Sequence, residues 1–229
     1  MISLKKDSAI EISINFYKYC HKTTFNIVKS FNFTLYNSNR MYSELKNYIA
    51  KQVTIENDEL ENIVEKFKPI KTVRNEMLCN IGQVCNHFYF IKKGCLRLYE
   101  IDNKGNEITG YFALENSIIS ANTSFMLQKP SRDCLVSLEP SELLVINRND
   151  FYKLVKSSNA FAHIYHQFVE FAFIHSQMRI YSFLGMEGID KLKWVMEHEP
   201  KLLSRISSKA IASYLGMTNS TLSKLRAKL

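Results

Sequence analysis

The last two dozen residues, 206–229, constrain the fold of this chain most, because their pattern is that of two short helices joined by a tight turn. Residues spaced by three or four positions share one helix face. Gly216 can adopt the left-handed conformation that ends the first helix, and Thr218 can cap the second through its side-chain oxygen. The apolar residues that would pack between the two helices are Ile211, Leu215, Leu222 and Leu225.

The outer face of the second helix carries side chains that form hydrogen bonds, namely Asn219, Ser220, Ser223, Lys224 and Arg226. A helix-turn-helix that places its second helix in the major groove of DNA has this layout. The surrounding charge agrees, because no Asp or Glu accompanies the six basic residues Lys201, Arg205, Lys209, Lys224, Arg226 and Lys228. An ordinary solvated helical hairpin is the alternative, since lysine-rich tails are common.

The net charge of the 229-residue chain is +8, with an isoelectric point near 9.1, which favours an anionic partner and nucleic acid over an anionic membrane. A hydrophobic content of 46% is sufficient for a real core. We find no apolar run long enough to span a membrane and no secretory signal in the first residues. We therefore expect a cytoplasmic protein without a membrane partner.

The chain has five cysteines, Cys20, Cys79, Cys85, Cys95 and Cys134, and no C-x-x-C pair. An odd number without a signal peptide predicts reduced thiols. Cys79, Cys85 and Cys95 fall in strand-like segments, where cysteine usually acts as a small buried hydrophobe. An iron–sulfur or redox-sensing cluster is the less favoured alternative, and we expect no cofactor.

Residues 1–40 are rich in Asn, Lys and aromatic residues, have irregular apolar spacing and receive no predicted role. Met41 begins a cleaner segment and is a hypothetical natural start. From there to Phe67 the spacing is helical, and Asp58 is expected to cap a helix that carries Leu60 and Ile63 on one face.

Between about Lys71 and Asn147 the apolar period changes to two and turn residues recur. Lys93-Gly94 predicts a turn, and residues 102–106 predict a hairpin that carries both Asn and Gly. Residues 134–138 and 143–146 are two further predicted strands. Many short strands with frequent turns indicate a sandwich or barrel, here a small jelly roll.

Helical sequence follows, beginning at Asp150 or Ser158. A heptad-like seam, spaced 3-4-3-4-3, consists of Phe161, Ile164, Phe168, Phe171, His175 and Met178. Other faces of this helix are also apolar, so it needs two neighbours, and we predict that a second copy of the chain is one of them. Packing on the chain's own domain is the alternative. His163 and His166 are spaced for a metal, but no further ligand completes a site and none is predicted.

Gly185 to Gly188 predicts a hinge between domains, after which Ile189–Met196 forms a helix that Pro200 ends. The predicted class is α+β: an N-terminal double-stranded β-helix (jelly roll) with flanking helices, a long dimerisation helix and a C-terminal helix-turn-helix domain. The predicted divisions are an N-terminal extension over 1–40, a jelly-roll domain over 41–150, a dimerisation helix over 151–184 and a helix-turn-helix domain over 185–229.

From about Met41 to Leu229 the chain resembles the Crp/Fnr family of bacterial transcription regulators. The residues that carry the resemblance are Gly82, Phe88-Tyr89-Phe90, Lys93 to Tyr99, Gly105, Glu107, Pro130-Ser131, Glu139, Ser141-Glu142-Leu143, Ile211 to Thr218 and Thr221-Leu222-Ser223. The resemblance implies a barrel that binds a cyclic nucleotide, a homodimer, double-stranded DNA as a partner and RNA polymerase as another.

The sequence departs from this family in the cassette that binds the cyclic phosphate. The family pairs a Gly-Glu motif with an Arg that is followed by a small residue, whereas residues 114–120 here contain no Gly-Glu. The Arg position falls on Ser131, with Arg132 beside it, and a shift of one residue along a strand reverses the face of a side chain. A cyclic phosphate needs a donor fork such as Arg. We expect no cyclic AMP binding of the usual kind, although Arg132 could serve if the register slips, and the effector is not identified.

Carried over from the family, the recognition helix covers about 218–228, and its base-reading positions are Asn219, Ser220, Ser223 and Lys224. Candidates for contacts to the DNA backbone are Ser207, Ser208, Thr218 and Arg226. Many relatives continue into a strand wing, which here must precede the motif or be missing. The sequence does not reveal the operator, or whether genes are activated or repressed.

Two other functions remain open at this point. One is a small-molecule-binding barrel whose terminal hairpin mediates protein contacts. The other is an enzyme, which we disfavour because His87 is the one histidine in the barrel sequence and no ligand cluster is apparent.

Overall fold

The computed structural model describes residues 39–229, so residues 1–38 of the predicted N-terminal extension lie outside the described part of the chain. Two helices, α2 (Asn39–Gln52) and α3 (Asn57–Val64), precede the strands. The strands and the helix among them are β1 (Lys68–Thr72), β2 (Met77–Cys79), β3 (His87–Lys93), β4 (Leu96–Ile101), β5 (Glu107–Ala113), β6 (Ile118–Ile119), α4 (Asn122–Leu127), β7 (Asp133–Ser137) and β8 (Ser141–Asn147). The remaining elements are α5 (Arg148–Ser157), α6 (Asn159–Gly185), α7 (Gly188–His198), α8 (Pro200–Arg205), α9 (Ser208–Tyr214) and α10 (Asn219–Arg226).

The strands form two antiparallel four-stranded sheets, in the orders β1-β8-β3-β6 and β2-β7-β4-β5. This arrangement confirms the predicted jelly roll and the α+β class. Strands β2 and β6 and helix α4 were not predicted, because segments of two to six residues are too short to display a period. No helix within residues 39–229 is both long enough and apolar enough to cross a membrane.

Two predicted turns are present as expected. Gly94, between β3 and β4, has a φ of 115°, a conformation that favours glycine. In the β4–β5 hairpin, the Asp102 side chain accepts hydrogen bonds from the backbone N–H groups of Lys104 and Asn106, both at 2.8 Å. Such bonds from an aspartate to its own following backbone fix a turn locally.

The main core lies between the barrel and the helices at one end of it, and Phe88 on β3 is at its centre. The Phe88 ring contacts those of Phe125, Phe151 and Phe168, with centroids 4.9–5.2 Å apart. These rings come from α4, α5 and α6, so a single strand residue joins three helices to the barrel. A second core contains Cys95 and Phe112 of the barrel together with apolar residues of α7 to α10.

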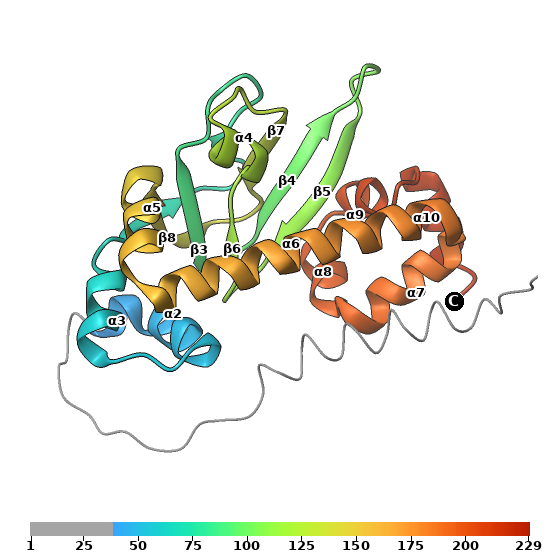
Figure 1. Ribbon diagram of the computed structural model, residues 1–229. Coiled ribbons are helices and arrows are strands. Elements are labelled where there is room, and N and C mark those ends of the chain that lie inside the picture. The colour runs from blue at the N-terminus through green and yellow to red at the C-terminus, as the bar shows by residue number, and fades with distance from the viewer. Residues whose placement is uncertain (1–38) are drawn as a thin grey trace, which may run out of the picture.

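Helix α6 is the long helix that the sequence predicts, and it runs from the barrel to the C-terminal helices (Figure 1). The predicted dimer seam faces this chain's own barrel along much of its length. Phe161, Ile164 and Phe168 are buried in the main core, and Phe171 and His175 lie against the ring of Tyr111 on β5. Heptad spacing identifies one helix face but cannot identify the surface on which that face packs.

The opposite side of α6 is apolar and exposed. The exposed fractions are 39% for Val169, 64% for Phe173 and 50% for Ile180. These three residues follow helical spacing, and we call them the outer stripe of α6. Helix α6 is therefore apolar on more than one side, as expected from the sequence, and the second copy of the chain as a neighbour stays a prediction.

The helix start predicted at Ser158 is confirmed, and other helix ends differ from those predicted. Glu56, and not Asp58, occupies the N-cap of α3. Asp58 lies in the first turn, where its negative charge interacts favourably with the helix dipole. The helical sequence after the barrel divides into α5, capped by Asn147, and α6, capped by Ser158. Pro200 begins α8 and does not merely end α7, because proline is well suited to the first helical position.

The four described cysteines, Cys79, Cys85, Cys95 and Cys134, are all buried and carry free thiols. Only Cys79 and Cys134 of these lie within strands, since Cys85 precedes β3 and Cys95 precedes β4. Burial raises the pKa values of Cys79 and Cys95 to about 12, so both thiols are protonated at neutral pH. They act as small buried hydrophobes.

We predict that Gly94→Ala lowers the free energy of unfolding by about 3 kcal/mol, because a Cβ at this position would lie 2.1 Å from Ser141 Oγ and 2.9 Å from Ser141 Cα. Urea unfolding followed by circular dichroism measures the change. Gly105→Ala is the matched control: its φ is also positive, at 81°, but no atom lies within 4 Å of the added Cβ. Its cost should be about 1 kcal/mol. Equal losses in the two variants would contradict the steric explanation.

Candidate nucleic-acid interface

Helices α9 and α10 form the helix-turn-helix that the sequence predicts. Gly216 has a φ of 68° in the turn between them. The Thr218 hydroxyl accepts a hydrogen bond from the Thr221 N–H at 3.1 Å and so caps α10. Ser207 caps α9 in the same way through the Ala210 N–H, at 3.3 Å. Leu222 is fully buried against the neighbouring helices, which fixes the face that α10 turns outward.

The four predicted base-reading residues, Asn219, Ser220, Ser223 and Lys224, are all exposed on α10. The predicted backbone-contacting residues, Ser207, Ser208, Thr218 and Arg226, are exposed beside them. Arg226 Nη1 donates to Ser208 Oγ at 2.9 Å, which brings the C-terminal part of α10 next to the start of α9. The structure thus gathers both sets on one helical pair, with Thr218 engaged in the cap.

Arg205 differs from the other basic residues of this region. Its guanidinium forms two hydrogen bonds of 2.8 Å with the carboxylate of Glu115 and also contacts that of Glu139. The hydrogen bonds from Arg205 lower the pKa of Glu115 to about 2. From the sequence, Arg205 is one of six basic residues expected to face phosphate, but in the structure the barrel loops before β6 and β8 supply carboxylates that compensate its charge.

Helix α9 also contacts the barrel directly, at strand β5. The Ser213 hydroxyl accepts hydrogen bonds from the backbone N–H of Thr109, at 2.9 Å, and from its hydroxyl, at 3.0 Å. Thr109 Oγ1 in turn accepts from the buried Arg97, whose Nη1 pairs with Glu107 at 2.6 Å. These contacts link the first helix of the motif to the interior of the barrel.

A second arginine, Arg179 on α6, joins three elements at the same place. Its Nη1 donates to the Tyr214 carbonyl at 2.9 Å, and its Nη2 donates to the Thr109 carbonyl at 3.0 Å. The guanidinium also lies over the Tyr214 ring, 4.4 Å from its centroid. Helices α6 and α9 and strand β5 are therefore held together around one side chain.

The two predicted effector residues are placed differently from each other. Ser131 is buried, and its hydroxyl donates to the Asp133 carbonyl at 2.9 Å and accepts from the Asp133 N–H at 3.1 Å. The Arg132 side chain is 86% exposed and lies 3.8 Å from a carboxylate oxygen of Glu100. In this arrangement neither side chain presents an arginine fork between the two sheets.

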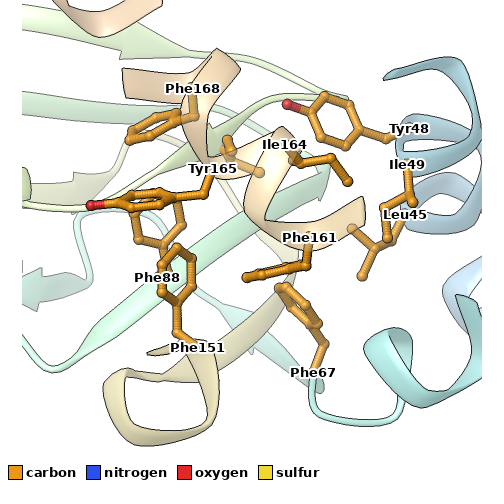
Figure 2. A pocket seen from close by; sticks show the side chains of 11 residues that line it. Leu45, Tyr48, Ile49, Phe67, Phe88, Phe151, Phe161, Ile164, Tyr165 and Phe168 are labelled. Atoms are coloured by element: carbon orange, nitrogen blue, oxygen red, sulfur yellow. The ribbon is translucent and has the colours of Figure 1, made fainter. Parts of the chain in front are cut away.

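An apolar pocket lies outside this cassette, where α2 and α6 cover the barrel (Figure 2). Its lining is apolar apart from the hydroxyl groups of Tyr48 and Tyr165, and burial raises the pKa of each to about 12. The lining residues are Leu45, Tyr48, Ile49, Phe67, Phe88, Ile118, Phe151, Phe161, Ile164, Tyr165 and Phe168. These side chains suit apolar contacts and supply no charged group that would bind a phosphate.

The barrel sequence matches a known protein family. Residues 70–158 match the model of the cyclic nucleotide-binding domain. The barrel therefore resembles a cyclic nucleotide-binding domain in sequence. A stretch of 74 residues of this chain is 31% identical to the anaerobic regulatory protein of Pasteurella multocida and 32% identical to that of Haemophilus influenzae. That stretch covers 32% of this chain and only 26% and 28% of these two relatives.

Solved structures extend the likeness beyond the cyclic nucleotide-binding domain. FixK2 from Bradyrhizobium japonicum superposes with a TM-score of 0.63 at 16% identity, over 71% of this chain and 84% of that one. The c-di-GMP-responsive regulator CLP of Xanthomonas campestris gives a TM-score of 0.62 at 12% identity, over 76% and 91% of the two chains. A Crp/Fnr-family regulator of Eubacterium rectale gives 0.61 at 16% identity, over 76% and 83%. The fold is that of the Crp/Fnr regulators.

Sequence reasoning found the exposed face of the helix-turn-helix but missed the residues that attach it to the barrel. Glu115 and Glu139 are single acidic residues in loops, 90 and 66 positions before Arg205. Their partner could not be inferred from local spacing. The sequence therefore offered no local signal for this pairing.

We predict that calorimetry detects no micromolar binding of cyclic AMP to the intact chain, because the family resemblance places Ser131 at the position of the phosphate-binding arginine and Arg132 faces solvent. Titration of Arg132→Ala in parallel provides the comparison. Micromolar binding that disappears in Arg132→Ala would show that the cassette shifts its register and would contradict the prediction.

Proposed function

We propose that the chain is a DNA-binding transcription regulator of the Crp/Fnr type, which binds as a homodimer and reads the major groove with α10. The observation that carries this proposal is the orientation of α10. Its apolar residue Leu222 is buried while Asn219, Ser220, Ser223 and Lys224 are exposed on the other side. A recognition helix requires this division between a packed face and a free polar face.

The chemistry of the exposed side chains suits base edges. Asn219 can form two hydrogen bonds with adenine, and Lys224 can contact the acceptors of guanine or a phosphate. Ser207, Ser208 and Arg226 lie where they would contact the DNA backbone, and Lys201, Lys209 and Lys228 add positive charge around them. This set retains a basic surface even though Arg205 pairs with the barrel.

The outer stripe of α6 supports the homodimer. Val169, Phe173 and Ile180 leave apolar side chains exposed along a helix that already packs on its barrel, and a second copy of α6 would cover them. Crp/Fnr regulators bind DNA typically as dimers. Two-fold symmetry would then place two recognition helices on half-sites about one helical turn, or ~34 Å, apart.

A regulator of this type would act in the cytoplasm and would meet RNA polymerase at its promoters, in agreement with the expectations from the sequence. The competing proposal is a small-molecule-binding barrel whose terminal hairpin mediates protein contacts. The first experiment separates these two functions. The purified chain selects duplexes from a random-sequence pool at low salt, and the affinity for the selected duplex is then measured against salt concentration.

The regulator predicts an enriched two-fold sequence and an affinity that falls steeply with salt, because phosphate binding releases counterions. If no duplex is enriched and the chain does not bind DNA even at low salt, the regulator proposal fails.

We predict that Lys224→Ala weakens binding to the selected duplex by about tenfold while the protein stays folded. A gel-shift titration measures the affinity. Lys104→Ala, at the tip of the β4–β5 hairpin, removes the same charge from an exposed position outside the recognition helix and is the matched control. The assignment of Lys224 is contradicted if both variants bind like the parent chain.

We predict that Phe173→Glu converts the proposed homodimer to a monomer, because the new carboxylate would be buried at the centre of the outer stripe of α6. Sedimentation equilibrium measures the mass. Val73→Glu is the control, since Val73 is also an exposed apolar residue, 67% accessible, but lies after β1 on the barrel. A dimer that persists in Phe173→Glu would place the subunit interface elsewhere.

A further inference from the structure

We propose that Arg205 is a positioning residue, which clamps the helix-turn-helix against the barrel in the orientation that binds DNA. The part of this inference that concerns DNA rests on the proposed function. The clamp itself is a property of the isolated chain and can be tested without DNA.

The geometry around Arg205 is selective for a guanidinium. Both terminal nitrogens bond the two oxygens of Glu115, in the parallel arrangement that only arginine can form, and Nη2 also reaches Glu139. Glu115 is oriented in addition by the backbone N–H of Gly94, which donates to its Oε1 at 3.0 Å. The three side chains are each about one quarter exposed, so water screens them only in part.

The clamp joins elements that are distant in the sequence. Arg205 is the last residue of α8, directly before α9, whereas Glu115 and Glu139 lie in the loops before β6 and β8. The position of Arg205 therefore fixes where α9 begins relative to the barrel. The contacts of Ser213 and Tyr214 with β5 and Arg179 then hold the end of α9. Fixed at both ends, α9 has a defined direction.

This attachment uses α9 and leaves α10 free. Ser213 and Tyr214 face the barrel, while the four base-reading residues of α10 remain exposed. The docked orientation therefore covers nothing that DNA would need. A domain held in one orientation loses less conformational entropy when two recognition helices engage two half-sites together. We infer that the clamp favours DNA binding and does not oppose it.

Hydrogen exchange of one backbone amide reports whether α9 is docked on the barrel. The Thr109 N–H on β5 donates to the Ser213 hydroxyl of α9, so its exchange with solvent depends on whether α9 is docked. Residue-resolved hydrogen exchange by NMR is measured for the parent chain and for Arg205→Met, which keeps an unbranched, flexible side chain but removes the guanidinium and its charge. We expect the Thr109 amide to exchange at least tenfold faster in Arg205→Met, with the central amides of β3 and β8 unchanged.

Lys201→Met is the matched control, because Lys201 is an exposed basic residue on the same short helix. It should leave the Thr109 amide as protected as in the parent chain. Unchanged protection in Arg205→Met would overturn the clamp. If the amides of β3 and β8 also lose protection in Arg205→Met, the double variant Glu115→Gln with Glu139→Gln replaces it and is judged by the same criterion.

The double variant also distinguishes the clamp from a phosphate contact. It leaves Arg205 in place and unpaired, so a phosphate-contacting role would keep or strengthen binding to the selected duplex. The clamp predicts about tenfold weaker binding in both variants, with the salt slope of the parent chain. The positioning role would be overturned if the affinity for the selected duplex rises or stays constant. It would also be overturned if the slope of log affinity against log salt concentration is smaller by about one in Arg205→Met. If no duplex is selected at all, the proposed function fails, while the exchange measurement still decides the clamp.

Discussion

Helix α6 is apolar on two opposite sides, and the arrangement of the whole chain depends on this property. One side inserts Phe161, Ile164 and Phe168 into the core around Phe88, where burial of large side chains contributes most of the stability. The other side leaves the outer stripe of Val169, Phe173 and Ile180 exposed. Because the same rigid helix continues to the C-terminal domain, the packing of its first half determines where that domain lies (Figure 1).

The two ends of α6 are held by different kinds of interaction. At the barrel, aromatic rings pack in a dry core. At the C-terminal domain, the second core is smaller and is accompanied by charged contacts, chiefly those of Arg205 and Arg179. Partly exposed ion pairs are weakened by salt, and each contributes little free energy to stability. The aromatic core contains no charges that salt would screen. Salt therefore weakens the attachment of the C-terminal domain to the barrel more than it weakens the aromatic core.

Much of the fold could be predicted from the sequence, because it is encoded in local patterns. The alternation of apolar residues with turns such as Lys93-Gly94 indicates the jelly roll, and the Gly216 and Thr218 pair indicates the helix-turn-helix. The exposed reading face follows from the same local argument, since burial of Leu222 leaves Asn219 and Lys224 on the other side. Periodicity is sufficient wherever the structural consequence lies within a few residues of its cause.

Contacts between distant segments could not be predicted in this way. The seam of α6 was identified, but not the surface on which it packs, because a helical pattern contains no information about which surface covers each face. The pairing of Arg205 with Glu115 and Glu139 depends on how three loops converge in space. The structure therefore adds what holds the candidate site to the rest of the molecule, whereas the site itself is already apparent in the sequence.

The connection between the barrel and the C-terminal helices has a consequence for how such a chain can diverge. Glu115 and Glu139 lie in loops, and neither belongs to the main core or to the reading face of α10. Loop positions of this kind tolerate substitution without loss of the fold. Descendants of this sequence could thus acquire a different angle between the two domains through one or two loop substitutions, while the operator preference and the architecture of the barrel are inherited unchanged.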